Sequence, residues 1–173
     1  MSITYIENFQ FFQFFEGCEL SYSGGSTYDH VTEIKCENVV LGKQMPDLPS
    51  SLQKIFAIDC GLSGSIPLLP SGIHTVDLSG NELTGIIPNL PQSLEVLNLD
   101  DNHLTGSIPN LPSLLTDDRR GQLQELRLSN NSLNGTISLL PYPNLNVLDL
   151  ANNDLSGTIS SIGNIMGILP YPN

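Results

Sequence analysis

A pattern of the form LxxLxLxxN recurs six times along the 173-residue chain and limits its fold more than any other feature. The six turns begin at residues 31, 52, 73, 94, 123 and 145, so successive starts lie 21, 21, 21, 29 and 22 residues apart. The third and the tenth positions after each start are aliphatic in every turn. No unit this short can bury its apolar face alone, so we expect the turns to stack, each contacting chiefly its neighbours.

Each turn divides into a short strand and a return arm. The second and third apolar residues of the pattern are two apart, so both lie on one face of a strand. An Asn column follows the strand, and we expect its amides to satisfy backbone groups of the neighbouring turn inside the stack. This column consists of Asn81, Asn102, Asn131 and Asn153. Glycine and proline come next, which predicts an extended rather than a helical return path.

The stretch "IHTVDLSGNELTGIIPNLP" closely resembles the plant-type leucine-rich repeat, whose mark is LxGxIP after the LxxLxLxxN strand. The resemblance covers residues 31–160. It implies a mostly β repeat fold of the α/β type: a right-handed, curved horseshoe solenoid with a concave parallel sheet, irregular convex arms and a second short strand near each LxG. Proteins with this repeat include receptor-like proteins, receptor kinase ectodomains and secreted inhibitors, so it also implies recognition of a protein or peptide on the concave face.

The predicted organisation is an N-terminal cap at residues 1–30 and six repeats at residues 31–173. Five of the six Phe residues lie between residues 9 and 15, and we expect them to cover the open end of the first strand. The segment LPYPN occurs at residues 140–144, just before a repeat, and again at residues 169–173. No C-terminal cap follows the sixth turn, so a longer protein is favoured over an improvised cap made by "SIGNIMGI".

The three cysteines fall in different positions. Cys60 occupies the Asn column, which predicts a buried free thiol. Within the resemblance, the stretch from Cys18 to Cys36 corresponds to a divergent cap that runs into the first strand. A disulfide between Cys18 and Cys36 fits an oxidising compartment, whereas Cys36 also suits a simple core position, and both interpretations stay open.

The charge and the motifs exclude several classes of function. A formal net charge of −12 with only 6 Lys and Arg residues disfavours a nucleic-acid partner. No apolar run is long enough for a membrane span. The sequence contains none of the common hydrolase, zinc or phosphate-loop motifs, so no enzyme activity, cofactor or metal is predicted. Asn130 and Asn134 are glycosylation acceptors if the chain is secreted. An extracellular or cell-surface location is favoured although no signal peptide is visible, with a cytoplasmic location as the alternative.

The outward positions of the six strands vary freely and therefore predict a tunable binding face. The candidate ligand-binding residues are Lys35, Lys54, Phe56, Ile58, Asp77, Asn98, Asp100, Arg127 and Asp149. Phe56 and Ile58 are suited to anchoring a ligand unless the Phe-rich cap covers them. The neighbouring carboxylates favour a basic protein or peptide.

Two rival functions remain from the sequence. A surface- or glycan-binding structural role, on ice or a cell wall, requires one outward column of repeated identical residues, whereas the outward columns of these strands are mixed. The chain also fits the sensor part of a longer receptor kinase. The sequence carries no expectation for the oligomeric state.

Overall fold

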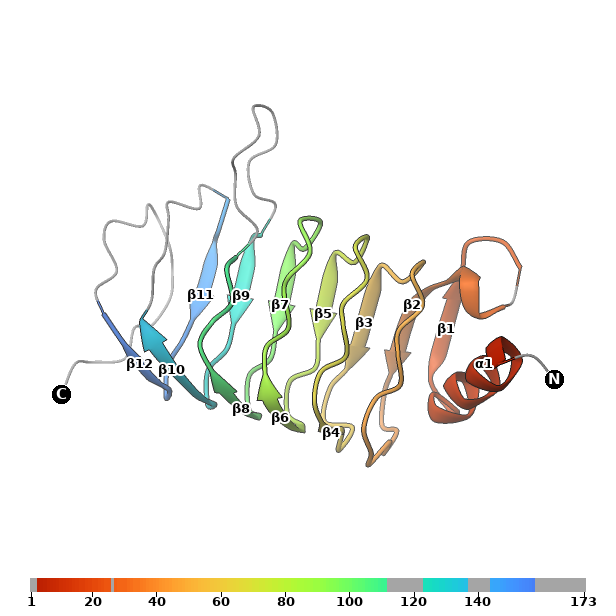
Figure 1. Cartoon of the computed structure of the whole chain (residues 1–173), viewed down its shortest axis with the longest axis horizontal. Helices are drawn as coiled ribbons and strands as arrows, with labels where there is room; N and C mark the ends of the chain where they lie inside the picture. Colours follow the sequence, from red (N-terminus) through yellow and green to blue (C-terminus); the bar gives the residue numbers. More distant parts are fainter. Residues whose placement is uncertain (1–2, 26, 112–122, 137–143, 158–173) are drawn as a thin grey trace.

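The computed structural model describes residues 3–25, 27–111, 123–136 and 144–157. Two sheets extend along the length of the molecule (Figure 1). The main sheet contains, in spatial order, β1 (Glu19–Tyr22), β2 (Val31–Cys36), β3 (Lys54–Ala57), β5 (Thr75–Asp77), β7 (Val96–Asn98), β9 (Glu125–Arg127) and β11 (Val147–Asp149). The second sheet, named the lateral sheet below, contains β4 (Ser63–Gly64), β6 (Glu82–Ile86), β8 (His103–Gly106), β10 (Ser132–Thr136) and β12 (Asp154–Ser156).

The register of the main sheet follows the sequence repeat. The six strands from β2 to β11 are parallel, and the third-position aliphatics pair in one continuous line across them. This line consists of Ile34, Ile55, Val76, Leu97, Leu126 and Leu148. The predicted leucine-rich repeat solenoid with a parallel sheet is therefore confirmed. Each later return arm adds a short strand to the lateral sheet near its LxG glycine, as the resemblance implied.

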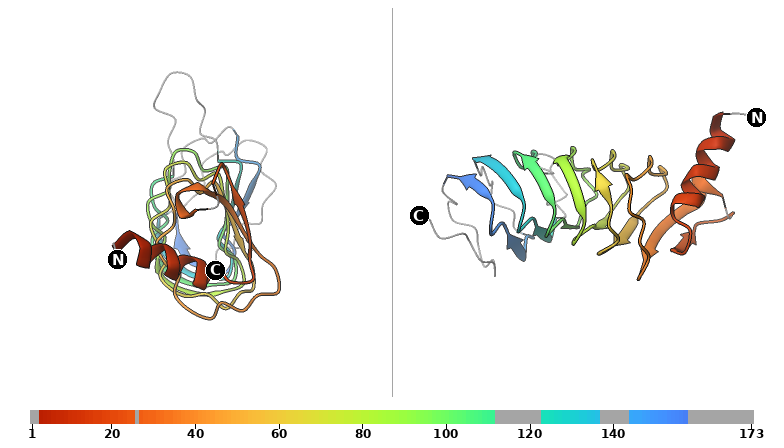
Figure 2. Two further views of the ribbon diagram at one scale, coloured as in Figure 1. Left: turned by 90° about the vertical axis from the view of Figure 1, so that its right-hand side faces the viewer. Right: turned by 90° about the horizontal axis from the view of Figure 1, so that it is seen from below.

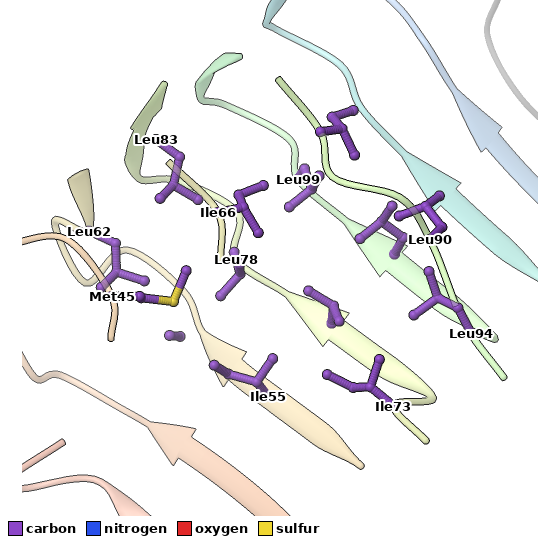
Figure 3. Close-up of a cluster of buried hydrophobic side chains, with 14 of the residues drawn as sticks. Met45, Ile55, Leu62, Ile66, Ile73, Leu78, Leu83, Leu90, Leu94 and Leu99 are labelled. Atoms are coloured by element: carbon purple, nitrogen blue, oxygen red, sulfur yellow. The ribbon is translucent and has the colours of Figure 1, made fainter. Parts of the chain in front are cut away.

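The core lies between the two sheets and consists almost wholly of aliphatic side chains (Figure 3). Seen along the stack, the turns superimpose as one flattened loop around this core (Figure 2, left). Ile55 projects into it from β3 and Ile73 from the residues just before β5, whereas Leu62 and Leu83 project from the opposite side. Each buried side chain of this size contributes roughly 1.5–3 kcal/mol. Cys60 is a buried free thiol, as predicted, and burial raises its pKa.

The Asn column lines one edge of the core and bonds to the backbone of two turns. The Asn81 Oδ1 accepts from the backbone N–H groups of Cys60 (3.1 Å) and Leu62 (2.9 Å). Its Nδ2 donates to the carbonyl oxygens of Ala57 and Leu78, both at 2.8 Å. Asn102, Asn131 and Asn153 repeat this arrangement one turn later each time. These side chains tie each turn to the one before it.

The N-terminal cap combines helix α1 (Ile3–Phe14), strand β1 and the short 3-10 helix η1 (Tyr28–His30). Phe11, Phe14 and Phe15 are buried and join the same core cluster as the side chains of β2. Strand β1 pairs antiparallel with β2, and the sequence did not predict it. The structure also answers the open question of the cysteines: Cys18 and Cys36 form a disulfide with 4.4 Å between their Cα atoms.

The turn that follows each main-sheet strand requires a left-handed backbone at the seventh position. All six residues there have positive φ: Asn38, Asp59, Gly80, Asp101, Asn130 and Asn152. These residue types tolerate this conformation best. They therefore belong to the turn that follows each strand.

Gly80 offers a direct test of this tight turn. Its φ is +67°, and a Cβ placed on it would lie 1.9 Å from the Asp59 Oδ1. We expect Gly80→Ala to lower the free energy of unfolding by about 1–2 kcal/mol, since Ala is strained there and displaces the Asp59 carboxylate. Urea unfolding followed by circular dichroism measures the change. The control is Gly72→Ala, which meets nothing within 4 Å and should be near neutral. Equal effects of the two changes would contradict this account of the turn.

Candidate functional site

Six of the nine candidate ligand-binding residues form one row across the exposed face of the main sheet. The register pairs Lys35 with Phe56, Phe56 with Asp77, and so on along the stack. The full row is Lys35, Phe56, Asp77, Asn98, Arg127 and Asp149. Lys54 lies two residues earlier on β3, and Ile58 and Asp100 lie just beyond the ends of their strands. The structure therefore places the predicted residues on one continuous face.

The carboxylates and the amide of this row hold the turns of their own strands. The Asp77 Oδ1 accepts from the Ser79 backbone N–H at 3.1 Å and from the Ser79 hydroxyl at 2.7 Å. Asn98 and Asp149 accept the backbone N–H two residues later in the same way, each at 3.1 Å. Such local bonds are typical of Asp and Asn at turns. These side chains therefore stabilise the turns in addition to facing outward, a role that was not predicted for them.

Asp100 stabilises the turn that follows the next strand, β9. The row residue of that strand is Arg127, which is not an acceptor. Its Oδ1 accepts from the Ser129 backbone N–H at 2.6 Å, across the insertion in the repeat. Burial raises the pKa of the Asp100 carboxyl, while the hydrogen bond from Ser129 opposes this rise and the nearby Asp149 charge adds to it. The guanidinium of Arg127 is bound by the Glu125 carboxylate on the same strand.

The raised pKa of Asp100 predicts a pH dependence of stability. The folded state holds the Asp100 proton more tightly than the unfolded chain, so the favourable contribution is complete at low pH and is lost as pH rises through the folded-state pKa. We therefore expect Asp100→Asn to gain in stability relative to the wild type between about pH 3 and pH 7. Urea unfolding at several pH values measures this difference. A difference in the free energy of unfolding that stays constant with pH, or that falls as pH rises, would contradict a raised pKa of Asp100.

A shallow pocket of about 270 Å³ opens at the end of the row nearest the N-terminal cap. Its lining comes from β2, β3 and the turns that follow them: Lys35, Cys36, Glu37, Asn38, Phe56 and Ile58. Phe56 is half-buried, and 44% of Ile58 is exposed. The ring contacts found in the cap join its aromatic residues to one another, and Ile58 stays open to solvent. Among the described residues, the Phe-rich cap therefore leaves this apolar surface accessible.

The charges beside the pocket are mixed. The Lys35 Nζ lies 2.7 Å from the Glu37 Oε1, and this hydrogen bond raises the pKa of Lys35. Glu37 and Asn38 were not among the candidate ligand-binding residues, although both line the pocket. Cys36 also lines the pocket, so the disulfide to Cys18 anchors the pocket wall to the cap. The pocket can receive an apolar group with a polar or charged group next to it.

The lateral sheet has an outward face of its own. The eleventh position of the later turns is a small polar residue throughout: Ser63, Thr84, Thr105, Asn134 and Ser156. Within the described parts of the chain, no group of three His, Cys, Asp or Glu residues could hold a metal ion. None of the described helices is long and apolar enough to cross a membrane. The inserted stretch "LLTDDRRGQ" at residues 114–122, which lengthens the fourth turn to 29 residues, and the segment "SIGNIMGI" lie outside the described residues.

The family model for the leucine-rich repeat matches residues 72–94, 93–115, 122–141 and 144–165. These ranges correspond to the last four turns, and the structure adds β2 and β3 of the first two turns to the same sheet in register. By sequence alone, no curated protein matches the chain.

Several solved plant structures are similar in fold. The BIR2 ectodomain from Arabidopsis thaliana is 28% identical, with a TM-score of 0.57, 80% of this chain and 75% of that chain covered. The plant peptide hormone receptor RGFR1, solved in complex with RGF2, is 29% identical, with a TM-score of 0.56, and the match covers 80% of this chain but 22% of the receptor. A plant ice-binding protein is 25% identical, with a TM-score of 0.58 and coverage of 81% and 46%. The chain thus spans less than half of two of these proteins.

Proposed function

We propose that this chain, which belongs to the leucine-rich repeat proteins of the plant type, is a non-catalytic recognition module that binds a peptide or protein segment across its main sheet. The observation that carries this proposal is the open pocket between Phe56 and Ile58 at one end of a polar row. Exposed aromatic and aliphatic groups on a rigid sheet are the usual anchors of binding sites.

The size of the pocket favours one anchoring side chain over a whole small molecule. Its volume of about 270 Å³ lies below the roughly 300–1,000 Å³ of typical small-molecule sites. The row continues from the pocket over four further strands. At about 4.8 Å between strands, the six strands span about 24 Å, which is the length of roughly seven extended residues. An extended segment with one apolar anchor fits this surface.

The charge of the face favours a ligand that has basic residues next to its apolar anchor residue. Asp77, Asp100 and Asp149 place three carboxyl groups on this face while they hold their turns. Arg127, the cation in this part of the row, is bound by Glu125. The net charge of −12 adds a long-range attraction for cations. A ligand with an aromatic or aliphatic residue followed by Lys or Arg is therefore favoured.

An extracellular or cell-surface location belongs to the same proposal. The Cys18–Cys36 disulfide fits an oxidising compartment. The matched BIR2 structure is an ectodomain, and the RGFR1 structure is a receptor with its bound RGF2. The chain would then act as a secreted binder or as the sensor part of a longer receptor.

The test is a selection of displayed peptides on the purified chain. A library of random peptides is panned on the wild-type protein, with counter-selection on Phe56→Asp. This substitution places a carboxylate in the apolar wall of the pocket. We expect enriched peptides to share an aromatic or aliphatic residue next to basic residues. Enrichment of acidic peptides, or of the same peptides on both proteins, would contradict the proposed site.

A second candidate function is adsorption of the lateral sheet to a flat surface such as ice. The observation in its favour is the small polar residue at the eleventh position of each later turn, together with the fold likeness to a plant ice-binding protein. Ice recrystallisation assays on the wild type and on Thr105→Lys distinguish it. Inhibition that Thr105→Lys removes would support adsorption, and no inhibition by the wild type would exclude it.

A further inference from the structure

Two glycosylation motifs lie close together near β10, and the structure gives their asparagines different surroundings. The first is Asn130-Asn131-Ser132 and the second is Asn134-Gly135-Thr136. Both acceptor side chains are exposed, so exposure alone does not choose between them. Their hydrogen bonds do.

The carboxamide of Asn130 forms hydrogen bonds to side chains of both neighbouring turns. Its Nδ2 donates to the Asp101 Oδ1 at 2.8 Å, and its Oδ1 accepts from the Asn152 Nδ2 at 2.6 Å. The residue itself has the left-handed backbone of the turn, with φ 54°. A sugar on the Asn130 Nδ2 would have to fit within this ladder of three side chains, so the folded stack opposes a glycan there.

Asn134 is a residue of β10, and this strand lies between β8 and β12 (Figure 1). Leu133 before it is buried, whereas Asn134 and Thr136 are both exposed. The Asn134 carboxamide makes no hydrogen bond to another described residue. Its register partner on β12 is Asp154, which is also exposed. A sugar on this amide would extend into solvent without disturbing the sheet.

We propose that Asn134 carries an N-linked glycan and that Asn130 does not. The co-reactant is a lipid-pyrophosphate-linked oligosaccharide of the secretory pathway. The Asn134 Nδ2 forms a bond to the anomeric carbon and loses one proton, while the bond from that carbon to the pyrophosphate oxygen breaks and the pyrophosphate leaves with the electron pair. The inference rests on the proposed extracellular location and is independent of the pocket on the main sheet.

The position of this glycan assigns different tasks to the two sheets. The sugar covers the outward face of the lateral sheet beside Asp154, and it leaves the row from Lys35 to Asp149 open. A glycosylated lateral sheet cannot adsorb flat to an extended surface. The modification is therefore compatible with ligand binding on the main sheet and incompatible with the second candidate function.

The test is expression of the full chain behind a cleavable secretion signal in insect or plant cells, followed by intact mass and glycopeptide mass spectrometry. We expect one glycan on the wild type and on Asn130→Gln, and none on Asn134→Gln or Thr136→Ala. Thr136→Ala keeps the asparagine, so it separates loss of the motif from an effect of the changed acceptor.

A glycan on Asn130, on both sites or on neither site of the secreted protein would overturn the proposal. The melting temperature supplies a second readout on unglycosylated protein from a non-secreting host. There, Asn130→Gln should melt several degrees lower because it disturbs the ladder, while Asn134→Gln should melt with the wild type. Binding of selected peptides, measured on the same unglycosylated protein, tests the main-sheet proposal separately.

Discussion

Replacement of Asn81 by alanine is expected to lower the free energy of unfolding by about 4 kcal/mol. The side chain is only 6% exposed and bonds to the backbone of two turns. Alanine would leave the Cys60 and Leu62 backbone N–H groups without their acceptor in the core edge, and three carbonyl oxygens would lose a donor. A buried polar group without a partner costs about 1–3 kcal/mol. The effect should exceed that of ordinary substitutions.

Urea unfolding followed by circular dichroism measures this loss, with Asn89→Ala as the matched control. Asn89 is exposed on a return arm, and its replacement should change stability by less than about 0.5 kcal/mol. Asn81→Asp gives a third comparison, because it keeps the oxygen acceptor but loses the donor and introduces a charge facing carbonyl oxygens. An Asn81→Ala protein as stable as the Asn89→Ala control would show that the column does not hold the turns together.

Replacement of Phe56 by alanine is expected to weaken binding of a selected peptide by about 10- to 100-fold, or about 1.4–2.7 kcal/mol. Phe56 is half-buried in the pocket wall, so most of the loss should appear on binding and not on unfolding. Isothermal titration calorimetry measures the dissociation constant. The control is Leu68→Ala, which removes a side chain that is 81% exposed on a return arm. Equal affinity of the Phe56→Ala and Leu68→Ala proteins for the peptide would show that Phe56 does not contribute to the binding site.

The repeat made most of the fold predictable from the sequence. The aliphatic columns and the Asn column set the number of turns, the parallel register and the inward face, because each column position recurs in the same place of every turn. The seventh-position residues are all Asn, Asp or Gly, the types that accept a left-handed backbone, so this turn could also have been recognised.

The less predictable features depend on contacts outside the repeat. Strand β1 pairs antiparallel with β2 through a four-residue segment without a strong alternation of apolar residues. The pairing of Cys18 with Cys36 depends on how the cap folds back, which the spacing alone leaves open. The capping role of Asp77 and Asp149 was visible in principle, because an Asp two residues before a turn N–H is a common local bond. The same role of Asp100 could not be recognised in the sequence, since its partner Ser129 lies on the other side of the insertion.

This division of roles sharpens the candidate site. The polar middle of the row both carries charge and holds the turns, so its substitution mixes stability with binding. Phe56 and Ile58 have no such second task among the described residues, and they line the pocket. The apolar end of the row is therefore where binding can be tested without disturbing the stack.

Photo-crosslinking of a selected peptide tests the central claim most directly. A photoactivatable residue replaces Ile58 in one protein, Leu68 in a second and Thr84 in a third, so that it reports in turn on the pocket, a return arm and the lateral sheet. Irradiation with the bound peptide, followed by mass spectrometry, locates the contact. The account predicts a crosslink from position 58 alone. A crosslink from position 68 or 84, with none from position 58, would contradict binding on the main sheet.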